Sequence, residues 1–249
     1  MAVYYVGMNM KDPLLGSNRK LRQALNCAFD ARTWNRFFND RHQPSDGPVP
    51  PGVEGRLETP FPYAYDVAKA KRLLVEAGYP DGIDPRTGKR LVISIALGRA
   101  DQGVREEVEL LQSFFDAIGI RLEPNFMTWT AYLKTVSEGN VSLFMMGWVL
   151  DYPDPENFLQ LFLSRNASPG ANHCNYANPA FDRLYDQAMT EPDPEKRNAI
   201  WRAAQEIVRE DCPWIFLYFA RSNALSWGHV GNYIPSDFPY GTEKYLYRK

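Results

Sequence analysis

The sequence predicts an α/β fold in which helices cover both faces of a layered sheet. Between residues 91 and 148 the hydrophobic pattern runs strand, helix, strand, helix, strand, an order typical of such a sheet. The last of these strands, "VSLFMMGW" at 141–148, is apolar throughout, as expected for a central strand that is covered on both faces. In open sheets of this kind, ligands bind beyond the carboxyl ends of the strands. Candidate site residues are therefore sought there.

The first 78 residues predict a strand, a helix, a long loop and a second helix. A β-rich run at 3–9 indicates the strand, and apolar residues at helical spacing indicate a helix over 18–38. Proline and glycine are frequent in 43–64, and a loop of that length usually wraps a surface or carries function. Asp66 is expected to cap the second helix, which Gly78 ends.

Helices and strands alternate through the rest of the chain as far as residue 220. A turn-rich connector, 79–90, leads into the strand at 91–98. An amphipathic helix at 104–119, with Gly119 as its expected C-cap, precedes the strand at 120–127. The remaining elements are a helix at 129–139, the apolar strand at 141–148, helices at 178–190 and 192–211, and a strand at 213–220.

Composition and charge exclude several classes of function. The 28 basic and 30 acidic residues nearly cancel to a formal net charge of -2, so no nucleic-acid partner is expected. No apolar run approaches the ~20 residues that span a bilayer, and no secretion signal is visible at the start. The three cysteines form no CxxC and the three histidines are scattered, so neither a metal site nor a cofactor is predicted. A disulfide between Cys174 and Cys212 could form in an oxidising compartment.

Asp151 follows the apolar strand at 141–148 by three residues, and no helix-capping role accounts for it. An acid where a strand leaves an apolar core is expected to be partly desolvated, and it then favours a cationic partner. That partner is either a lysine or arginine of the same chain or an ammonium group of a ligand.

Arg99 directly follows the strand at 91–98, so it is also expected at a carboxyl end. Its guanidinium could hold a ligand carboxylate in a bidentate fork, pair with a neighbour such as Asp101, or lie in solvent. If Arg99 and Asp151 converge, they could bind both ends of a zwitterion. Three aromatic residues near the same predicted edge could line that pocket or belong to the core: Trp129, Trp148 and Tyr152.

Signs of catalysis are few. Asp151 and Asp154 could serve a hydrolase, but two acids on one turn seldom face each other across a substrate. Asp154 is instead expected to cap the helix that begins with Pro155. The sequence contains no GxSxG elbow, no HExxH and no Walker loop.

Six blocks of the sequence, in order, resemble the oligopeptide- and dipeptide-binding proteins of ABC importers, which form extracellular solute-binding protein family 5. They are "GMNMKDPLLGSNRKLRQALNCAFDA", "YDVAKAKRLLVEAGYPDG", "LLQSFFDAIGIRLE", "WTAYL", "MMGWVLDYPDPENF" and "NPAFDRLYDQAMTEPDPEKRNAIWRAAQEIVREDCPWIFLYF", and they cover nearly the whole chain. The resemblance implies a periplasmic-binding-protein-like (type II) lobe, with a mixed sheet flanked by helices on both faces and no enzymatic activity.

The resemblance also implies roles for the candidate residues. In peptide-binding members the acid of the "GW---D" block pairs with the peptide α-ammonium, and that position is Asp151. In the dipeptide-binding branch an arginine after the strand that precedes the "LLQ" helix binds the peptide carboxylate, and the matching residue is Arg99. Trp148 and Tyr152 would line the cleft.

Family members have two lobes that close over the ligand, and this chain resembles the second. Residues 1–227 would form that lobe, and 228–249 would return to a first lobe that lies outside this sequence. Without that lobe, the aromatic residues of the tail should be exposed. A disulfide of the dipeptide-binding branch would have its second cysteine at Cys174, whereas Ser164 stands near the position of the first.

The implied function is the substrate-binding component of an ABC importer, in the periplasm or outside the cell. It would bind di- or oligopeptides in extended geometry between the lobes and deliver them to the permease subunits of the transporter. The same fold also serves nickel, haem and oligosaccharide ligands, so a non-peptide solute is the alternative.

Overall fold

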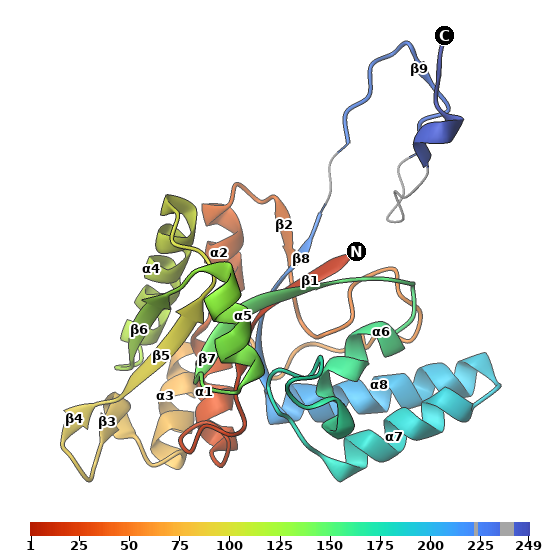
Figure 1. Ribbon diagram of the computed structural model, residues 1–249. Helices are drawn as coiled ribbons and strands as arrows, with labels where there is room; N and C mark the ends of the chain where they lie inside the picture. Colours follow the sequence, from red (N-terminus) through yellow and green to blue (C-terminus); the bar gives the residue numbers. More distant parts are fainter. Residues whose placement is uncertain (222–223, 235–241) are drawn as a thin grey trace.

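The computed structural model describes residues 1–221, 224–234 and 242–249, and its body is built on a six-stranded sheet (Figure 1). The strand order is β2-β8-β1-β7-β5-β6. These strands are β1 Ala2–Met8, β2 His42–Pro44, β5 Val92–Leu97, β6 Arg121–Phe126, β7 Leu143–Val149 and β8 Trp214–Ala220.

The sheet is mixed, and the strand directions distinguish its two ends. β5 pairs in parallel with β6 and β7, whereas β1 is antiparallel to both β7 and β8. The strands β5, β6, β7 and β8 therefore all end at the same side, together with the start of β1. We call this side the carboxyl end of the sheet, and the side where those four strands begin the amino end.

Helices cover both faces of the sheet, as predicted, and each face has its own hydrophobic cluster (Figure 1). Buried residues of α1 to α4 form one cluster, and those of α5 to α8 form the other. The first four helices are α1 Arg19–Ala28, α2 Ala31–Phe37, α3 Val67–Glu76 and α4 Gln102–Asp116. The others are α5 Trp129–Ser137, α6 Glu156–Leu159, α7 Pro179–Thr190 and α8 Pro194–Asp211.

The two central strands send alternate side chains into the two clusters. On β1, Val6 and Met8 belong to the first cluster and Tyr5 to the second. On β7, Leu143 belongs to the first and Phe144 to the second. Because both sides of β7 are covered, its apolar sequence is explained, and the prediction of a central strand at 141–148 is confirmed.

The single helix predicted over 18–38 is in fact two helices. The backbone of Phe29 is extended and ends α1, and the carboxylate of Asp30 then caps α2 by accepting the N–H groups of Arg32 and Thr33. The apolar spacing continues across this break, so periodicity alone did not detect it. The cap predicted at Asp66 is present, since its carboxylate accepts the N–H of Lys69 at 2.8 Å.

Short elements fill the segments that were predicted as loops. The strand β2 occupies the start of the loop predicted at 43–64, where it pairs with β8 at one edge of the sheet. The connector at 79–90 contains η1 Pro80–Gly82 and a hairpin of β3 Ile83–Asp84 with β4 Lys89–Arg90. Two further 3-10 turns follow α6, η2 Gln160–Phe162 and η3 Ser164–Asn166.

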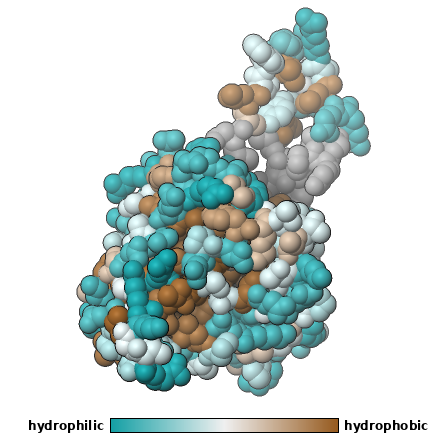
Figure 2. Space-filling model, turned by 60° about the vertical axis from the view of Figure 1, so that its left-hand side comes forward, coloured by the Kyte–Doolittle hydropathy of each residue, from teal (hydrophilic) through white to brown (hydrophobic). Residues whose placement is uncertain are grey.

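The described part of the C-terminal tail lies away from the sheet and its helices (Figure 1). It contains β9 Val230–Gly231, η4 Thr242–Tyr245 and β10 Tyr247–Arg248. Figure 2 shows hydrophobic atoms on this projecting segment. Tyr233, Tyr245 and Tyr247 are 40%, 60% and 59% exposed, which agrees with the expected exposure of tail aromatics. Phe238 and Tyr240, which belong to the same prediction, lie outside the described residues.

All three cysteines are buried and free, so the disulfide considered between Cys174 and Cys212 is not formed. The sulfur of Cys174 instead accepts the indole N–H of Trp214 at 3.1 Å. Among the helices in the described part of the chain, none combines the length and apolar character needed to cross a bilayer.

Candidate ligand-binding site

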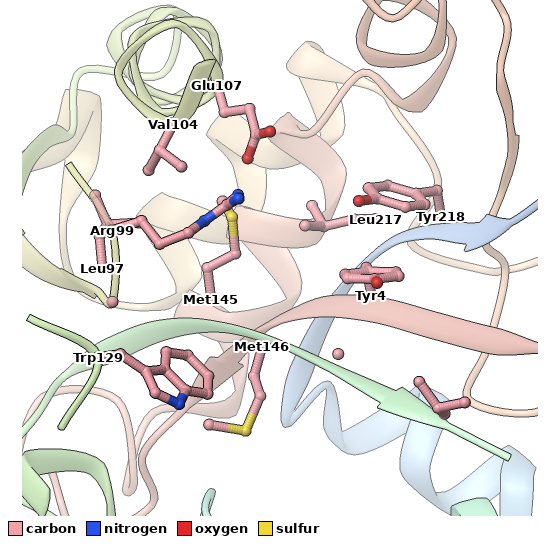
Figure 3. Close-up of a pocket in the computed structure, with 13 residues that line it drawn as sticks. Tyr4, Leu97, Arg99, Val104, Glu107, Trp129, Met145, Met146, Leu217 and Tyr218 are labelled. Atoms are coloured by element: carbon pink, nitrogen blue, oxygen red, sulfur yellow. The ribbon is translucent and has the colours of Figure 1, made fainter. Parts of the chain in front are cut away.

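A pocket of about 360 Å³ lies at the carboxyl end of the sheet, mainly on the face covered by α1 to α4, and Met146 and Trp129 line it from the other face (Figure 3). Its walls come from the ends of β5, β7 and β8, the start of β1, and the first turns of α4 and α5. These elements converge because parallel strands end together and β1 begins beside them. The side chains that define its chemistry are Tyr4, Arg99, Glu107, Trp129, Met145 and Tyr218.

Two glycines allow aromatic rings to lie directly on the backbone at this pocket. A β-carbon at Gly98 would lie 2.7 Å from the ring of Trp129, and one at Gly147 would lie 2.8 Å from the ring of Tyr4. The Tyr4 ring in turn stacks on Tyr218, with ring centroids 4.8 Å apart. Any larger residue at either glycine would displace a ring, so the local sequence shapes the aromatic walls.

Arg99 lies at the mouth of the pocket, directly after β5, as predicted from its position in the sequence. Its side chain is 66% exposed, and its Nε atom lies 3.8 Å from a carboxylate oxygen of Asp101. Asp101 also caps α4 by accepting the N–H of Val104. A pair this long and this exposed contributes little, so the guanidinium is available to another anion.

Glu107 is the pocket residue that the sequence analysis missed. It lies on α4, is half-buried, and has no hydrogen bond or ion pair among the described residues. Burial raises the pKa of the Glu107 carboxyl, and nearby Arg99 opposes that rise. A signal was present in the sequence: Val104, Val108 and Leu111 form the buried stripe of α4, and Glu107 interrupts the same side of the helix.

Asp151 lies in the exposed turn after β7 and does not line this pocket, although Val149, two residues earlier, does. Its exposure corrects the expectation of partial desolvation. A carboxylate oxygen of Asp151 accepts the amide N–H of Asn157 at 3.3 Å. Among the described residues, no lysine or arginine forms an ion pair with it. Its charge is therefore open to a partner from outside the chain.

Trp148 and Tyr152 lie near Asp151 rather than in the pocket. Trp148 packs against the second hydrophobic cluster, on the other face of the sheet, and its indole N–H donates to Asn157 at 3.0 Å. The hydroxyl of Tyr152 donates to Glu156. Of the five predicted site residues, the structure thus brings Arg99 and Trp129 together in the pocket. The other three are grouped near the end of β7, with Trp148 on the strand and Asp151 and Tyr152 in the turn after it.

Asp154 is held in place by the fold. Its carboxylate forms a two-pronged pair with the guanidinium of Arg197, at 2.7 and 3.0 Å. It also accepts the N–H of Glu156, in the first turn of α6, at 2.9 Å. The N-cap position itself is Pro155, one residue later than expected. Arg197 therefore already engages both oxygens of this carboxylate within the fold.

The carboxyl ends of the strands in this mixed sheet thus carry a pocket together with exposed charges of both signs. Residues 1–170 match the model of the bacterial extracellular solute-binding proteins, family 5 Middle, and the chain belongs to this family. Members of this family are solute-binding proteins, and the resemblance seen in the sequence is confirmed.

The chain is similar to relatives that are more than twice its length. It is 30% identical to heme-binding protein A of Haemophilus influenzae, over 96% of this chain and 43% of that protein. It is also 30% identical to di/tripeptide-binding protein 2 of Pseudomonas aeruginosa, over 79% of this chain and 36% of that protein.

A solved structure shows the same fold. The periplasmic binding protein DppA from Helicobacter pylori, in complex with the peptide STSA, matches with a TM-score of 0.77 and 29% identity. The match covers 88% of this chain and 41% of that one. The predicted periplasmic-binding-protein-like fold is therefore confirmed.

Proposed function

We propose that this chain supplies one wall of the peptide-binding cleft of an ABC importer's solute-binding protein. One observation carries the proposal: the carboxyl end of the sheet presents an acid, Asp151, and a base, Arg99, and both are exposed. A peptide in solution is a zwitterion, and these two side chains would bind its α-ammonium and its carboxylate. The printed names of the relatives support a peptide ligand, since they include a di/tripeptide-binding protein and DppA with a bound peptide.

The strand register supports a ligand of several residues. Ala96 on β5 is level with Phe144 on β7, so continuing that register sets Arg99 level with Gly147. Asp151 lies four residues further along, in the turn after β7, which corresponds to at most about 13 Å at a strand rise of about 3.3 Å per residue. An extended peptide of about four residues has that length, whereas a free amino acid is much shorter.

The rest of the proposal concerns the whole protein. A first lobe, outside this sequence, would close over the peptide, and the loaded protein would deliver it to the permease subunits of the transporter. The protein would work in the periplasm or outside the cell, as the periplasmic DppA suggests.

The tail at 228–249 would pack against that first lobe, whereas 1–227 would form the second lobe. Its exposed tyrosines, Tyr233, Tyr245 and Tyr247, support this role, because such side chains are usually covered in a finished structure. Hydrogen exchange in a two-lobe protein would then slow at the backbone amides of the tail. Exchange there as fast as in a free peptide would contradict this part of the proposal.

Haem is the second candidate ligand, because one matched relative is a heme-binding protein. The observation that favours it is a stack of three rings beside the pocket. Tyr4 and Tyr218 are 4.8 Å apart, and Tyr218 and His42 are 4.0 Å apart. Such flat walls suit a planar ligand, but a haem stacked on these rings would give no role to the exposed carboxylate of Asp151.

A titration followed by NMR tests the proposal with the 249-residue chain. One lobe offers only part of the contacts, so weak binding is expected and amide shifts are the suitable measurement. Tetra-alanine should shift the amides near Arg99 and those of residues 151–157. Asp151→Asn should remove that binding, and so should acetylation of the peptide's α-amine.

The matched control is Asp81→Asn. Asp81 is an exposed acid at the other end of the sheet, in a left-handed conformation that asparagine tolerates. This variant should bind as the native chain does. Binding of haemin with no response to tetra-alanine would favour the second candidate, and tetra-alanine binding unchanged in Asp151→Asn would refute the proposed role of that acid.

A further inference from the structure

We infer that Glu107 makes the pocket of Figure 3 a subsite for a cationic side chain of the ligand. The preferred peptide would then carry lysine or arginine at its carboxyl-terminal position. This inference rests on the proposed function and adds to it the class of peptide that the site selects.

The first argument is the state of the Glu107 carboxylate. It is half-buried on the wall of the pocket, and no hydrogen bond or ion pair among the described residues engages it. Figure 3 shows this carboxylate facing the interior of the pocket, between Arg99 and Tyr218. A carboxylate that has lost part of its hydration and has no partner favours a cation in the adjacent space.

The charges around Glu107 do not already satisfy it. Arg99 is a positive charge that acts on Glu107, but the carboxylate closest to the Arg99 guanidinium is that of Asp101, at 3.8 Å. Asp101 acts on Glu107 as a second negative charge. The pocket therefore has a negative wall, and a basic group at its mouth.

The aromatic walls also favour a cation. The rings of Tyr4, Tyr218 and Trp129 line the pocket, and the faces of such rings attract ammonium and guanidinium groups. Met145 and Leu217 line the same space and would contact the aliphatic stem of a long side chain. The volume of about 360 Å³ is of the size that binds small ligand groups.

The position of Arg99 indicates which residue of the peptide enters. If its guanidinium binds the terminal carboxylate, the side chain on the same residue is the group closest to the pocket. A basic side chain there would meet Glu107, whereas an acidic one would be repelled by it. Glu107 would thus determine specificity, and Arg99 would hold the peptide end.

Two pairs of peptides test this on the native 249-residue chain by NMR titration. Ala-Ala-Ala-Lys is compared with Ala-Ala-Ala-norleucine, and Ala-Ala-Ala-Arg with Ala-Ala-Ala-citrulline, because each pair differs chiefly in one charge. The basic peptide of each pair should bind about tenfold more tightly, which corresponds to about 1.4 kcal/mol. Its binding should also shift the amides of α4 around Glu107.

Glu107→Gln keeps the shape of the side chain and removes its charge. It should abolish the preference for the basic peptides and leave the binding of the norleucine peptide within about twofold of the native value. Glu109→Gln is the matched control, since Glu109 is exposed on the same helix and does not line the pocket. It should keep the full preference.

The outcomes separate this inference from the proposed function. Equal binding within both pairs of peptides would overturn the role of Glu107 and leave peptide binding intact. A Glu107→Gln variant that lost both peptides equally would also overturn it, because the residue would then be structural. Absence of binding by all four peptides would refute the proposed function itself.

Discussion

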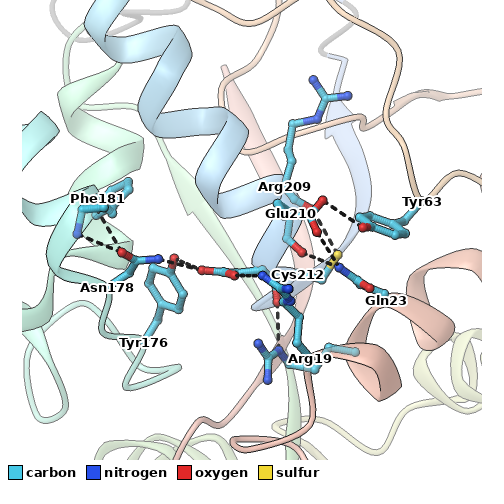
Figure 4. A network of polar contacts seen from close by, with 12 residues as sticks. Arg19, Gln23, Tyr63, Tyr176, Asn178, Phe181, Arg209, Glu210 and Cys212 are labelled. Atoms are coloured by element: carbon cyan, nitrogen blue, oxygen red, sulfur yellow. Dashed lines mark hydrogen bonds and ion pairs between the residues drawn. The ribbon is translucent and has the colours of Figure 1, made fainter. Parts of the chain in front are cut away.

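Two groups of charged side chains, one at each end of the sheet, differ in how firmly the chain itself engages them. At the amino end, Arg22 is 5% exposed, and its guanidinium donates to the carbonyls of Asp211 at 2.9 Å and Leu15 at 2.7 Å. The carboxylate of Asp211 accepts the hydroxyl of Tyr176 and the amide of Asn178, in the network drawn in Figure 4. Both side chains thus have partners within the chain, Arg22 as a buried residue and Asp211 as a partly buried one.

The charged side chains near the pocket, at the carboxyl end, have fewer and longer contacts within the described part of the chain. Arg99 and Asp151 are exposed, and Glu107 is half-buried without a hydrogen bond among the described residues. Unpaired polar groups are costly in proportion to their burial, so the amino end must satisfy its charges whereas the open carboxyl end need not. The difference indicates that one end holds the lobe together and the other is available to a ligand.

The same substitution at both ends should have very different effects on stability. Arg22→Met removes the donor to the buried carbonyl of Leu15 and to the partly buried carbonyl of Asp211, and we expect the free energy of unfolding to fall by about 3 kcal/mol. Arg99→Met removes an exposed side chain and should change it by less than about 0.5 kcal/mol. Urea unfolding followed by circular dichroism measures both. Equal losses in the free energy of unfolding for the two variants would contradict the difference between the two ends of the sheet.

The two aspartates extend the comparison. Asp211→Asn weakens hydrogen bonds from Tyr176, Asn178 and Arg19, so we expect a loss of about 1–2 kcal/mol in the free energy of unfolding. Asp151→Asn removes a single long contact to Asn157 and should be nearly neutral for stability, while it removes peptide binding. The prediction would be wrong if Asp151→Asn were the more destabilising of the two.

Gly98→Ala tests whether the backbone shapes the aromatic wall. The added methyl group would press on the Trp129 ring, and displacing that ring should cost about 1 kcal/mol. Because Trp129 is 55% exposed, the ring can move, and its fluorescence maximum should shift. Gly47→Ala is the control, since the nearest atom to its added carbon would lie at an ordinary 3.6 Å. An unchanged spectrum in Gly98→Ala would show that the ring does not depend on this glycine.

The smallest expected effect concerns Glu107 and pH. Burial raises the pKa of this carboxyl in the folded state, so the folded chain holds its proton more tightly than the unfolded chain does. The contribution of Glu107 to stability is therefore lost as pH rises from the ordinary glutamate pKa through the raised one. Glu107→Gln should remove this loss. The free energy of unfolding of the variant, taken relative to that of the native chain, should therefore be higher at neutral pH than at acid pH. Unfolding curves at several pH values measure this, with Glu109→Gln as the reference variant. A relative stability of Glu107→Gln that falls from acid to neutral pH would contradict burial as the cause.

Local chemistry was readable in the sequence, and so was the class of fold. The cap at Asp66 depends on a hydrogen bond within one turn, and the apolar run at 141–148 requires cover on both faces wherever the strand lies. The placement of Arg99 and Asp151 after β5 and β7 followed from the same order of elements. Each of these features depends on neighbours in the chain, so a local pattern is enough to predict it.

Only the tertiary structure decided which charges are satisfied. Nothing in the neighbouring sequence distinguishes Arg22 from Arg99. Arg22 is buried against backbone carbonyls of other segments, whereas Arg99 is exposed at the mouth of a pocket. Glu107 meets Tyr4 and Tyr218 only because β1 and β8 pair, although these strands are about two hundred residues apart. The sequence by itself determined most of the longer strands and helices and their order. Burial and charge pairing depend on contacts between distant segments, and these were decided when the sheet assembled.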